Sequence, residues 1–107
     1  YKLEVANIFH AGDGNLHPVI LFDPQVEGET ERAERFGADI LKLCVDVGGC
    51  LTGEHGVGIE KRDLMSYQYN EIELAQQRRI KTAFDAKWLL NPAKVFPLDS
   101  RLADEAA

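Results

Sequence analysis

Two short runs rich in Val, Ile and Phe, residues 3–9 and 16–22, lie near the start of the chain on either side of a cluster of turn-forming residues. That cluster is Ala11-Gly12-Asp13-Gly14-Asn15. Apolar β-branched and aromatic residues favour strands, whereas Gly, Asp and Asn favour chain reversals. The pattern therefore predicts a β-hairpin, with a loop slightly longer than a two-residue turn.

A helix is expected over residues 30–47, where apolar residues recur at three- and four-residue spacing. Thr30 with its acidic neighbours is a suitable start, and Gly48-Gly49 is a typical stop. Directly afterwards, residues 50–52 predict a third, short strand.

A helical turn is expected around residues 59–66, and a second long helix over residues 70–89. Asn91-Pro92 ends that helix, because the residue before a proline is disfavoured in the helical conformation.

The order strand, strand, helix, short strand, helix indicates an α+β fold, with helices on one face of a small antiparallel sheet. The length of 107 residues supports one modest core and not two. Because the chain begins within an apolar run and the sheet looks incomplete, we expect a piece cut from a longer protein, with further strands upstream of Tyr1. Residues 1–97 would be the C-terminal portion of a domain, and residues 98–107 a mobile acidic tail.

The distribution of charge argues against a nucleic-acid partner, because the net charge is −6 and Lys and Arg do not form a run. No apolar stretch approaches the ~20 residues of a membrane span. We therefore expect a cytoplasmic protein. Cys44 and Cys50 do not form a Cys-x-x-Cys pair, and we expect both to be reduced and structural.

Two histidines flank the hairpin loop, in the segment His10-Ala-Gly-Asp-Gly-Asn-Leu-His17. If His10 and His17 pair directly across the two strands, their side chains lie on the same face, ~5 Å apart at Cβ. Two such imidazoles can share one divalent metal ion. A one-residue change of register would place them on opposite faces.

A second glycine-rich segment, Thr52-Gly53-Glu54-His55-Gly56-Val57-Gly58, adds two more ionisable side chains. We hypothesise that His10, His17 and Glu54 bind a divalent metal with open coordination positions, as catalytic metals have. The metal would hold a 2-hydroxy acid, and His55 would take the hydroxyl proton as general base. Zn, Mn and Fe(II) suit these ligands equally well.

Other interpretations of these residues fit less well. A single histidine in a strand is more often an ordinary core or surface residue than a ligand. The glycines of the second segment lack the Gly-Lys-Ser/Thr of a P-loop and the GxGxxG spacing of a dinucleotide-binding fold. Gly12-x-Gly14 is better explained as part of a turn.

Three segments together resemble the C-terminal signatures of FAD-linked oxidases, the vanillyl-alcohol-oxidase-like flavoproteins. The segments are His10-Ala-Gly-Asp-Gly-Asn-Leu-His17-Pro, Gly48-Gly49-x-x-Thr-Gly53-Glu54-His55-Gly56-Val-Gly58 and Asn91-Pro92-x-Lys94-Val. The resemblance covers residues 5–97 and is strongest to the branch that contains the FAD-linked subunit of bacterial glycolate oxidases and the D-lactate dehydrogenases.

The resemblance implies a ferredoxin-like substrate domain, of which this chain is the final portion, and FAD bound mainly by a separate N-terminal domain. It implies that His10, His17 and Glu54 bind the metal, that His55 accepts the proton and that Asn91 lies near the flavin. It also implies iron–sulfur and flavoprotein partner subunits and a location in the cytoplasm or at the inner face of the bacterial membrane. Oxygen, a quinone or an iron–sulfur subunit remain alternatives as electron acceptor.

One segment departs from the family pattern. Relatives read Phe-Asp-Pro-x-Gly-Leu-Leu-Asn-Pro-Gly-Lys, whereas this chain has Ala86, Trp88 and Ala93 where that pattern has Pro, Gly and Gly. We expect the loss of Pro and Gly to let the second helix run on, and Trp88 to need a packing partner. Both expectations bear on the placement of Asn91.

The favoured function is therefore that of a flavin-dependent oxidoreductase fragment acting on the CH-OH group of glycolate or D-lactate. The alternative is a metal-binding or assembly module that is inactive alone because the FAD domain is absent. An excised piece also exposes strand edges and apolar surface, so we expect the isolated chain to form a homo-oligomer.

Overall fold

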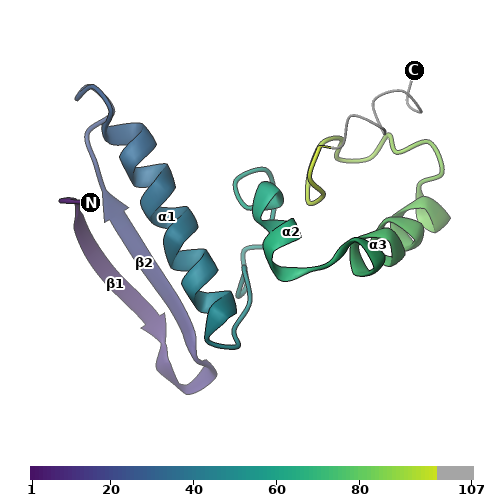
Figure 1. Ribbon diagram of the computed structural model, residues 1–107, viewed down its shortest axis with the longest axis horizontal. Coiled ribbons are helices and arrows are strands. Elements are labelled where there is room, and N and C mark those ends of the chain that lie inside the picture. Colours follow the sequence, from purple (N-terminus) through teal and green to yellow (C-terminus); the bar gives the residue numbers. More distant parts are fainter. Residues whose placement is uncertain (99–107) are drawn as a thin grey trace.

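Strand β1 (Glu4–His10) pairs antiparallel with β2 (Asn15–Leu21) in the computed structural model, which describes residues 1–98 (Figure 1). The predicted hairpin is confirmed. Its loop contains a 3-10 turn, η1 (Ala11–Asp13), and ends at Gly14, whose φ of 66° lies in the left-handed region that glycine tolerates. The acidic tail expected over residues 98–107 lies, apart from Leu98, outside the described residues.

The register of the hairpin differs from the expected one. His17 lies opposite Ile8, and His10 lies opposite Asn15, so the two histidines are diagonal neighbours and not a direct pair. The register differs from the expected one because the loop has only four residues, 11–14, so the strands pair as far as His10 with Asn15. Since the displacement is two residues, an even number, both imidazoles still project from the same face.

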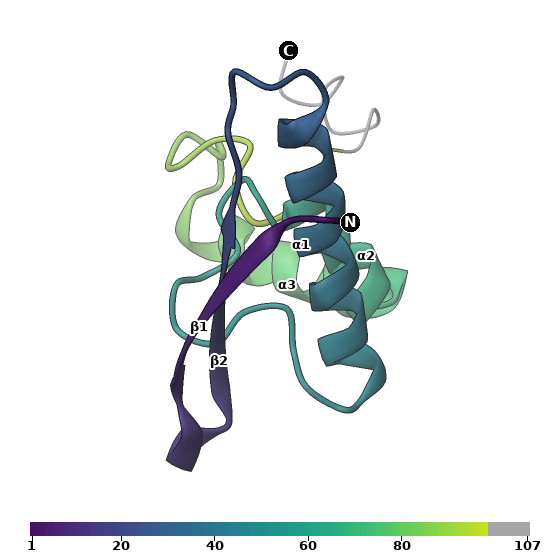
Figure 2. The ribbon, with the colours of Figure 1, turned by 90° about the vertical axis from the view of Figure 1, so that its left-hand side faces the viewer.

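Helix α1 (Glu29–Asp46) covers the other face of the hairpin (Figure 2). A β-carbon at Gly37 would lie 3.8 Å from Ile20 Cδ1, and the rings of Tyr1 and Phe36 stack with centroids 5.0 Å apart. The histidines therefore project from the face that α1 leaves open. This arrangement confirms the α+β class with a helix packed on one side of a small sheet.

The glycine pair after α1 ends the helix as predicted. Gly48 adopts a φ of 91°, its N–H donates to Val45 O at 3.0 Å, and the N–H of Gly49 donates to Cys44 O at 2.7 Å. These two hydrogen bonds form a Schellman motif, which supplies donors to carbonyl groups that have no partner within the helix at its C-terminus.

The third strand expected over residues 50–52 is absent from the described part of the chain, where the sheet has two strands. The segment is instead an irregular stretch whose Leu51 side chain is only 2% exposed. The Leu51 N–H donates to Gln68 Oε1 at 2.8 Å, so a side chain and not a neighbouring strand satisfies this backbone group. The apolar signal of these residues therefore reflects burial in the core and not strand pairing.

The core lies beneath this stretch. Leu51, Met65 and Leu74 are buried together, and five partly buried side chains pack against them: Leu41, Val45, Val57, Leu64 and Tyr69. The helical turn expected at 59–66 is present slightly later, as η2 (Arg62–Leu64) and α2 (Met65–Gln68).

Helix α3 (Glu71–Phe84) begins at a capping box, in which the Asn70 side chain accepts from the Glu73 N–H while the Glu73 carboxylate accepts from the Asn70 N–H. It ends five residues before the predicted Leu89. The expectation that the helix would run on was therefore wrong, and the reason lies in Asp85, which is described with the site below.

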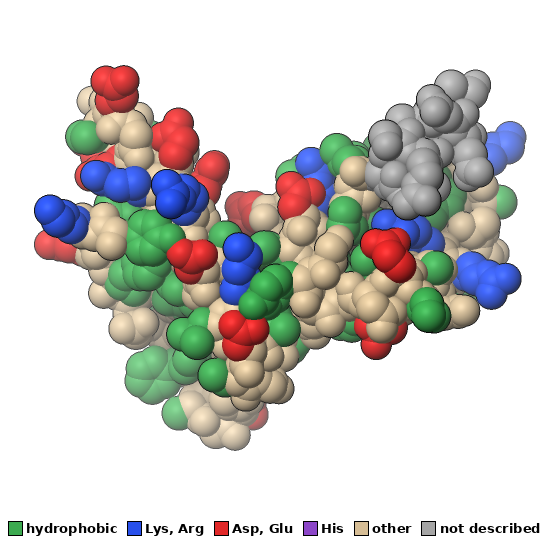
Figure 3. Space-filling model, in the orientation of Figure 1, with side chains coloured by type: hydrophobic (Ala, Val, Ile, Leu, Met, Phe, Trp, Pro, Cys, Tyr) green, Lys and Arg blue, Asp and Glu red, His purple; other side chains and the backbone are tan. Residues whose placement is uncertain are grey.

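The hairpin with α1 forms one arm of the molecule, and α2, α3 and the following loop form another (Figure 1). The radius of gyration is 16.1 Å, larger than the ~13 Å typical of a domain of this length. Many large apolar side chains are exposed, and Figure 3 shows hydrophobic groups over the hairpin arm. On the open face of the hairpin these include Ile8, Val19 and Leu21.

Candidate metal centre and the cleft beside it

The glycine-rich loop reaches the hairpin at Gly53. A β-carbon on Gly53 would lie 2.3 Å from Asn15 Oδ1 and 2.9 Å from Asn15 Cγ, so any other residue here would require the Asn15 side chain or the loop to shift. Gly56 and Gly58 follow with φ values of 84° and 56°. Glycine at these positions thus permits both the close approach and the turns that place Glu54 beside the histidines.

One carboxylate oxygen, Glu54 Oε1, lies close to three imidazoles. Its distance is 2.9 Å to His17 Nε2, 3.7 Å to His10 Nε2 and 3.8 Å to His55 Nε2. The His17 ring lies in the middle, with its centroid 5.4 Å from that of His10 and 5.3 Å from that of His55. The four residues named from the sequence are therefore brought together by three segments of chain.

Burial distinguishes the members of this cluster. The His17 side chain is only 21% exposed, whereas that of His55 is 74% exposed. His17 Nε2 is buried and has no hydrogen-bond partner, because its close approach to Glu54 Oε1 is not aligned as a hydrogen bond. An unsatisfied buried nitrogen normally costs about 1–3 kcal/mol.

The cluster fits a divalent metal ion. One ligand atom each from His10, His17 and Glu54 lie within 4.8 Å of one another. Ligands at ~2.1 Å from a common ion are separated by roughly 3–4 Å, so small side-chain movements suffice. Two imidazoles and a carboxylate are ligands that Zn, Mn and Fe(II) accept. A metal would also satisfy the orphaned His17 nitrogen.

A cleft of about 370 Å³ adjoins this cluster, lined by residues 55–61 and by Lys94. His55 belongs to both, since its imidazole lies beside Glu54 and also lines the cleft. Lys94 comes from the loop after α3, which one hydrogen bond joins to the glycine loop and a second joins to η2. The Val95 N–H donates to Gly58 O at 2.8 Å, and Arg62 Nη1 donates to Ala93 O at 2.6 Å.

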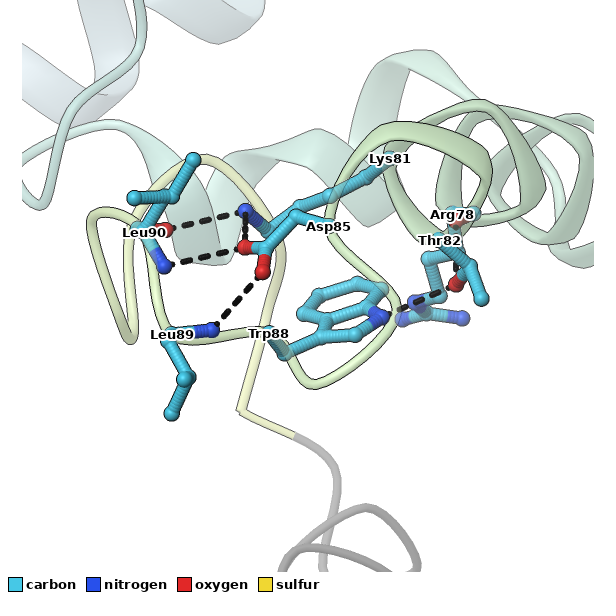
Figure 4. Close-up of polar contacts among 7 residues, drawn as sticks. All are labelled: Arg78, Lys81, Thr82, Asp85, Trp88, Leu89 and Leu90. Atoms are coloured by element: carbon cyan, nitrogen blue, oxygen red, sulfur yellow. Dashed lines mark hydrogen bonds and ion pairs between the residues drawn. The ribbon is translucent and has the colours of Figure 1, made fainter.

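Asp85 organises the start of that loop (Figure 4). Its carboxylate accepts hydrogen bonds from the N–H groups of Leu89 and Leu90, and Lys81 Nζ donates to it at 2.9 Å. Lys81 Nζ also donates to Leu90 O. Such side-chain bonds to the backbone compete with helix continuation, which explains the early end of α3. The bond from Lys81, with those from Leu90 and Leu89, holds the pKa of the Asp85 carboxyl below its usual value.

Trp88 packs against Phe96, which confirms the expectation that its side chain needs a packing partner. Its indole Nε1 donates to Thr82 Oγ1 at 2.8 Å, and its ring packs against Phe96 with centroids 5.7 Å apart. Lys81 Nζ lies 5.3 Å from the ring centroid. Trp88 and Ala93, at the positions of the two family glycines, have φ values of 52° and 59°. The loop therefore retains the left-handed backbone although the glycines are replaced.

Asn91 is not part of the histidine cluster. It lies in the same loop at a φ of 47°, and it is not among the residues that line the cleft. The cysteines are both free, with Cys44 half-buried and Cys50 exposed, its thiol 3.2 Å from Thr52 O.

Three residues of this region were not predicted from the sequence: Lys61, Lys94 and Asp85. Lys94 lay within a quoted motif, but no spacing rule connects it to a loop more than thirty residues earlier.

Within the described residues, no helix is long and apolar enough to cross a membrane.

Known proteins similar to this chain give a consistent result. The family described as FAD linked oxidases, C-terminal domain, matches residues 1–95. The chain is 52% identical over its full length to the glycolate oxidase subunit GlcD of Escherichia coli K12, of which it covers 21%, and 38% identical over 94% of its length to that of Bacillus subtilis, of which it covers 22%. It is 41% identical over 84% of its length to the mitochondrial D-lactate dehydrogenase [cytochrome] of Kluyveromyces lactis, of which it covers 15%. The chain thus spans about a fifth of the length of these relatives.

Proposed function

The chain belongs to the family of FAD-linked oxidase C-terminal domains, and on that premise we propose that it forms the substrate-side part of a flavin-dependent dehydrogenase that oxidises the CH-OH group of a small 2-hydroxy acid. Relatives named as glycolate oxidase subunits and D-lactate dehydrogenases support glycolate or D-lactate as the substrate.

The observation that carries this proposal is the convergence of His10, His17 and Glu54 around a buried histidine nitrogen that has no hydrogen-bond partner. These three residues would hold a divalent metal. A bound metal supplies a Lewis acid that makes the hydroxyl of a coordinated 2-hydroxy acid more acidic. Three protein ligands would leave coordination positions open for a substrate.

His55 is the proposed proton acceptor. Its imidazole is mostly exposed, lines the cleft and lies next to the ligand Glu54, so it can contact a substrate held at the metal. The hydroxyl proton passes to His55, the C–H hydrogen leaves with both bonding electrons, and the hydroxyl carbon becomes the carbonyl of a 2-oxo acid. The flavin, when bound, supplies the acceptor for that hydride.

FAD itself is proposed to be bound mainly by a part of the enzyme outside these residues. The described residues offer no phosphate-binding loop of the P-loop or GxGxxG type. Asn91 is proposed to face the flavin from the loop after α3. We propose a cytoplasmic location, at most peripheral to a membrane, with iron–sulfur and flavoprotein subunits as partners.

A second candidate function is that of an assembly module. The exposed apolar side chains of the hairpin and the small core favour it. Without a flavin-binding part, the isolated chain is expected to bind a metal but not to turn over. Both strands of a two-stranded sheet are edges, so a second copy of the chain is the proposed occupant of this surface.

Turnover of the full-length, flavin-loaded enzyme tests the function. Glycolate, D-lactate and D-2-hydroxyglutarate are each supplied with a dye acceptor, before and after His55→Ala. We expect activity on glycolate or D-lactate and a loss of about 10²–10⁴-fold in the variant, the usual contribution of a general base. Full activity after the substitution would refute His55 as the base, and activity with none of the three acids would refute the substrate class.

A further inference from the structure

The cleft beside His55 carries two lysines for which the metal and the general base provide no role. Lys61 and Lys94 both line it, from segments more than thirty residues apart in the chain. Neither lies within 4.0 Å of a carboxylate among residues 1–98, where the ion pairs of lysine are limited to Lys81 with Asp85. Glu60 is the acidic residue in the lining, so the cleft holds two cations and one anion on a chain whose net charge is −6.

The backbone around both lysines is fixed by hydrogen bonds. The N–H of Lys61 donates to Val57 O at 3.2 Å, and its Nζ lies 3.5 Å from Thr52 Oγ1. Lys94 is flanked on both sides by tethered residues, Ala93 through Arg62 and Val95 through Gly58. These tethers fix where the two side chains begin, so both ammonium groups stay within reach of the cleft, and less backbone freedom is lost when an anion binds.

From this geometry we propose that the cleft is an anion subsite in which Lys61 and Lys94 bind the carboxylate of a small hydroxy acid. The inference rests on the proposed function, since the ligand is the proposed substrate or an analogue of it. The volume of about 370 Å³ is at the small end of the range for ligand sites. Because His55 lines the same cleft, an anion held by the lysines lies next to the proposed base.

NMR titration of the metal-free 107-residue chain with glycolate, at constant ionic strength in sodium chloride, tests this subsite. The amide signals of Gly56 and Gly58 report from the cleft lining. We expect saturable shifts in the native chain, and an increase in the apparent Kd of about fivefold or more in Lys61→Gln and in Lys94→Gln, as expected for loss of one charge-assisted contact. Lys87→Gln, an exposed lysine of the same loop, is the matched control and should leave the Kd unchanged. Lys94→Arg should retain binding, which separates loss of charge from loss of fold.

A parallel titration with inorganic phosphate distinguishes a carboxylate subsite from one for the phosphates of a cofactor. Saturable binding of phosphate without binding of glycolate would overturn the assignment. So would equal effects of Lys87→Gln and Lys94→Gln, because the shifts would then reflect general charge screening. The metal is removed throughout, so a negative result here leaves the metal site and the role of His55 standing, and their failure leaves this result intact.

Discussion

Gly53 lies against the side chain of Asn15, so closely that a β-carbon at Gly53 would be 2.3 Å from Asn15 Oδ1. This contact joins the glycine-rich loop to the hairpin. Since Glu54 follows Gly53 and the histidines lie on the hairpin, the contact sets the distance between the carboxylate and its two imidazole partners.

Gly53→Ala is therefore expected to weaken metal binding by about tenfold or more, in the range seen when the support of a metal ligand is lost. The added methyl group requires either the Asn15 side chain or the loop to shift, and we expect the loop to shift and to move Glu54 away from His17. Titration with Zn²⁺ measures the affinity. Gly12→Ala is the control, because nothing lies within 4 Å of its added β-carbon and its φ is not positive. Equal affinities in the two variants would show that the contact does not position Glu54.

Ala93→Gly is expected to stabilise the chain by about 1 kcal/mol, since alanine at a φ of 59° carries a steric cost that glycine avoids. Urea unfolding measures the change in the free energy of unfolding. Ala86→Gly, in the same loop but without a positive φ, should not stabilise. A loss of stability in Ala93→Gly would mean that the left-handed backbone is not strained.

The stability of the folded chain is expected to depend on pH through the Asp85 carboxyl, in the loop after α3. Lys81 and the N–H groups of Leu90 and Leu89 lower its pKa in the folded chain from the ordinary value of 3.8. A carboxyl whose pKa is lower in the folded chain than in the unfolded chain stabilises the fold at pH values above its unfolded pKa. That contribution is lost as the pH falls through the folded pKa.

The difference in unfolding free energy between the native chain and Asp85→Asn should therefore be constant near neutral pH and shrink below about pH 4. Lys81→Gln removes the largest cause of the shift and should raise the pKa of Asp85 in an NMR titration. A stability difference that is the same at pH 3 and pH 7 would contradict this account.

Self-association of the isolated chain is expected from the open face of the hairpin. Val19 projects from that face and is 41% exposed, beside the free strand edges. Light scattering coupled to gel filtration should show a dimer or larger species, and Val19→Lys should shift it toward the monomer. Val47→Lys, on a residue at the end of α1 that is 76% exposed, is the matched control. A clean monomer of the native chain at high concentration would contradict the prediction.

Local signals in the sequence were sufficient for several parts of the molecule. The turn cluster at residues 11–15 predicted the hairpin, and Gly48-Gly49 predicted the end of α1, because both depend on backbone preferences of neighbouring residues. The grouping of His10, His17, Glu54 and His55 was also predicted, from the residue types in the two glycine-rich segments and from the family resemblance. The direct pairing assumed for the two histidines was wrong, but the even displacement kept them on one face.

Features that depend on particular hydrogen bonds outside regular secondary structure were not predicted. Residues 50–52 resemble a strand, but the Gln68 side chain of α2 accepts the hydrogen bond from the Leu51 N–H, and the Leu51 side chain lies in the core. The helical pattern continues to Leu89, yet Asp85 diverts the chain through bonds to Leu89 and Leu90. The cleft between the glycine loop and Lys94 arises from tethers that no local pattern encodes.

The central claim is that Glu54, with His10 and His17, holds a divalent metal. Elemental analysis of the chain after loading with Zn²⁺ or Mn²⁺ and removal of the excess tests it most directly, with Glu54→Gln and His10→Ala beside Glu31→Gln, an exposed glutamate on α1. We predict about one ion per chain in the native protein and in Glu31→Gln, and a loss of most of the metal in the other two variants. Unchanged metal content in Glu54→Gln and His10→Ala would contradict the account.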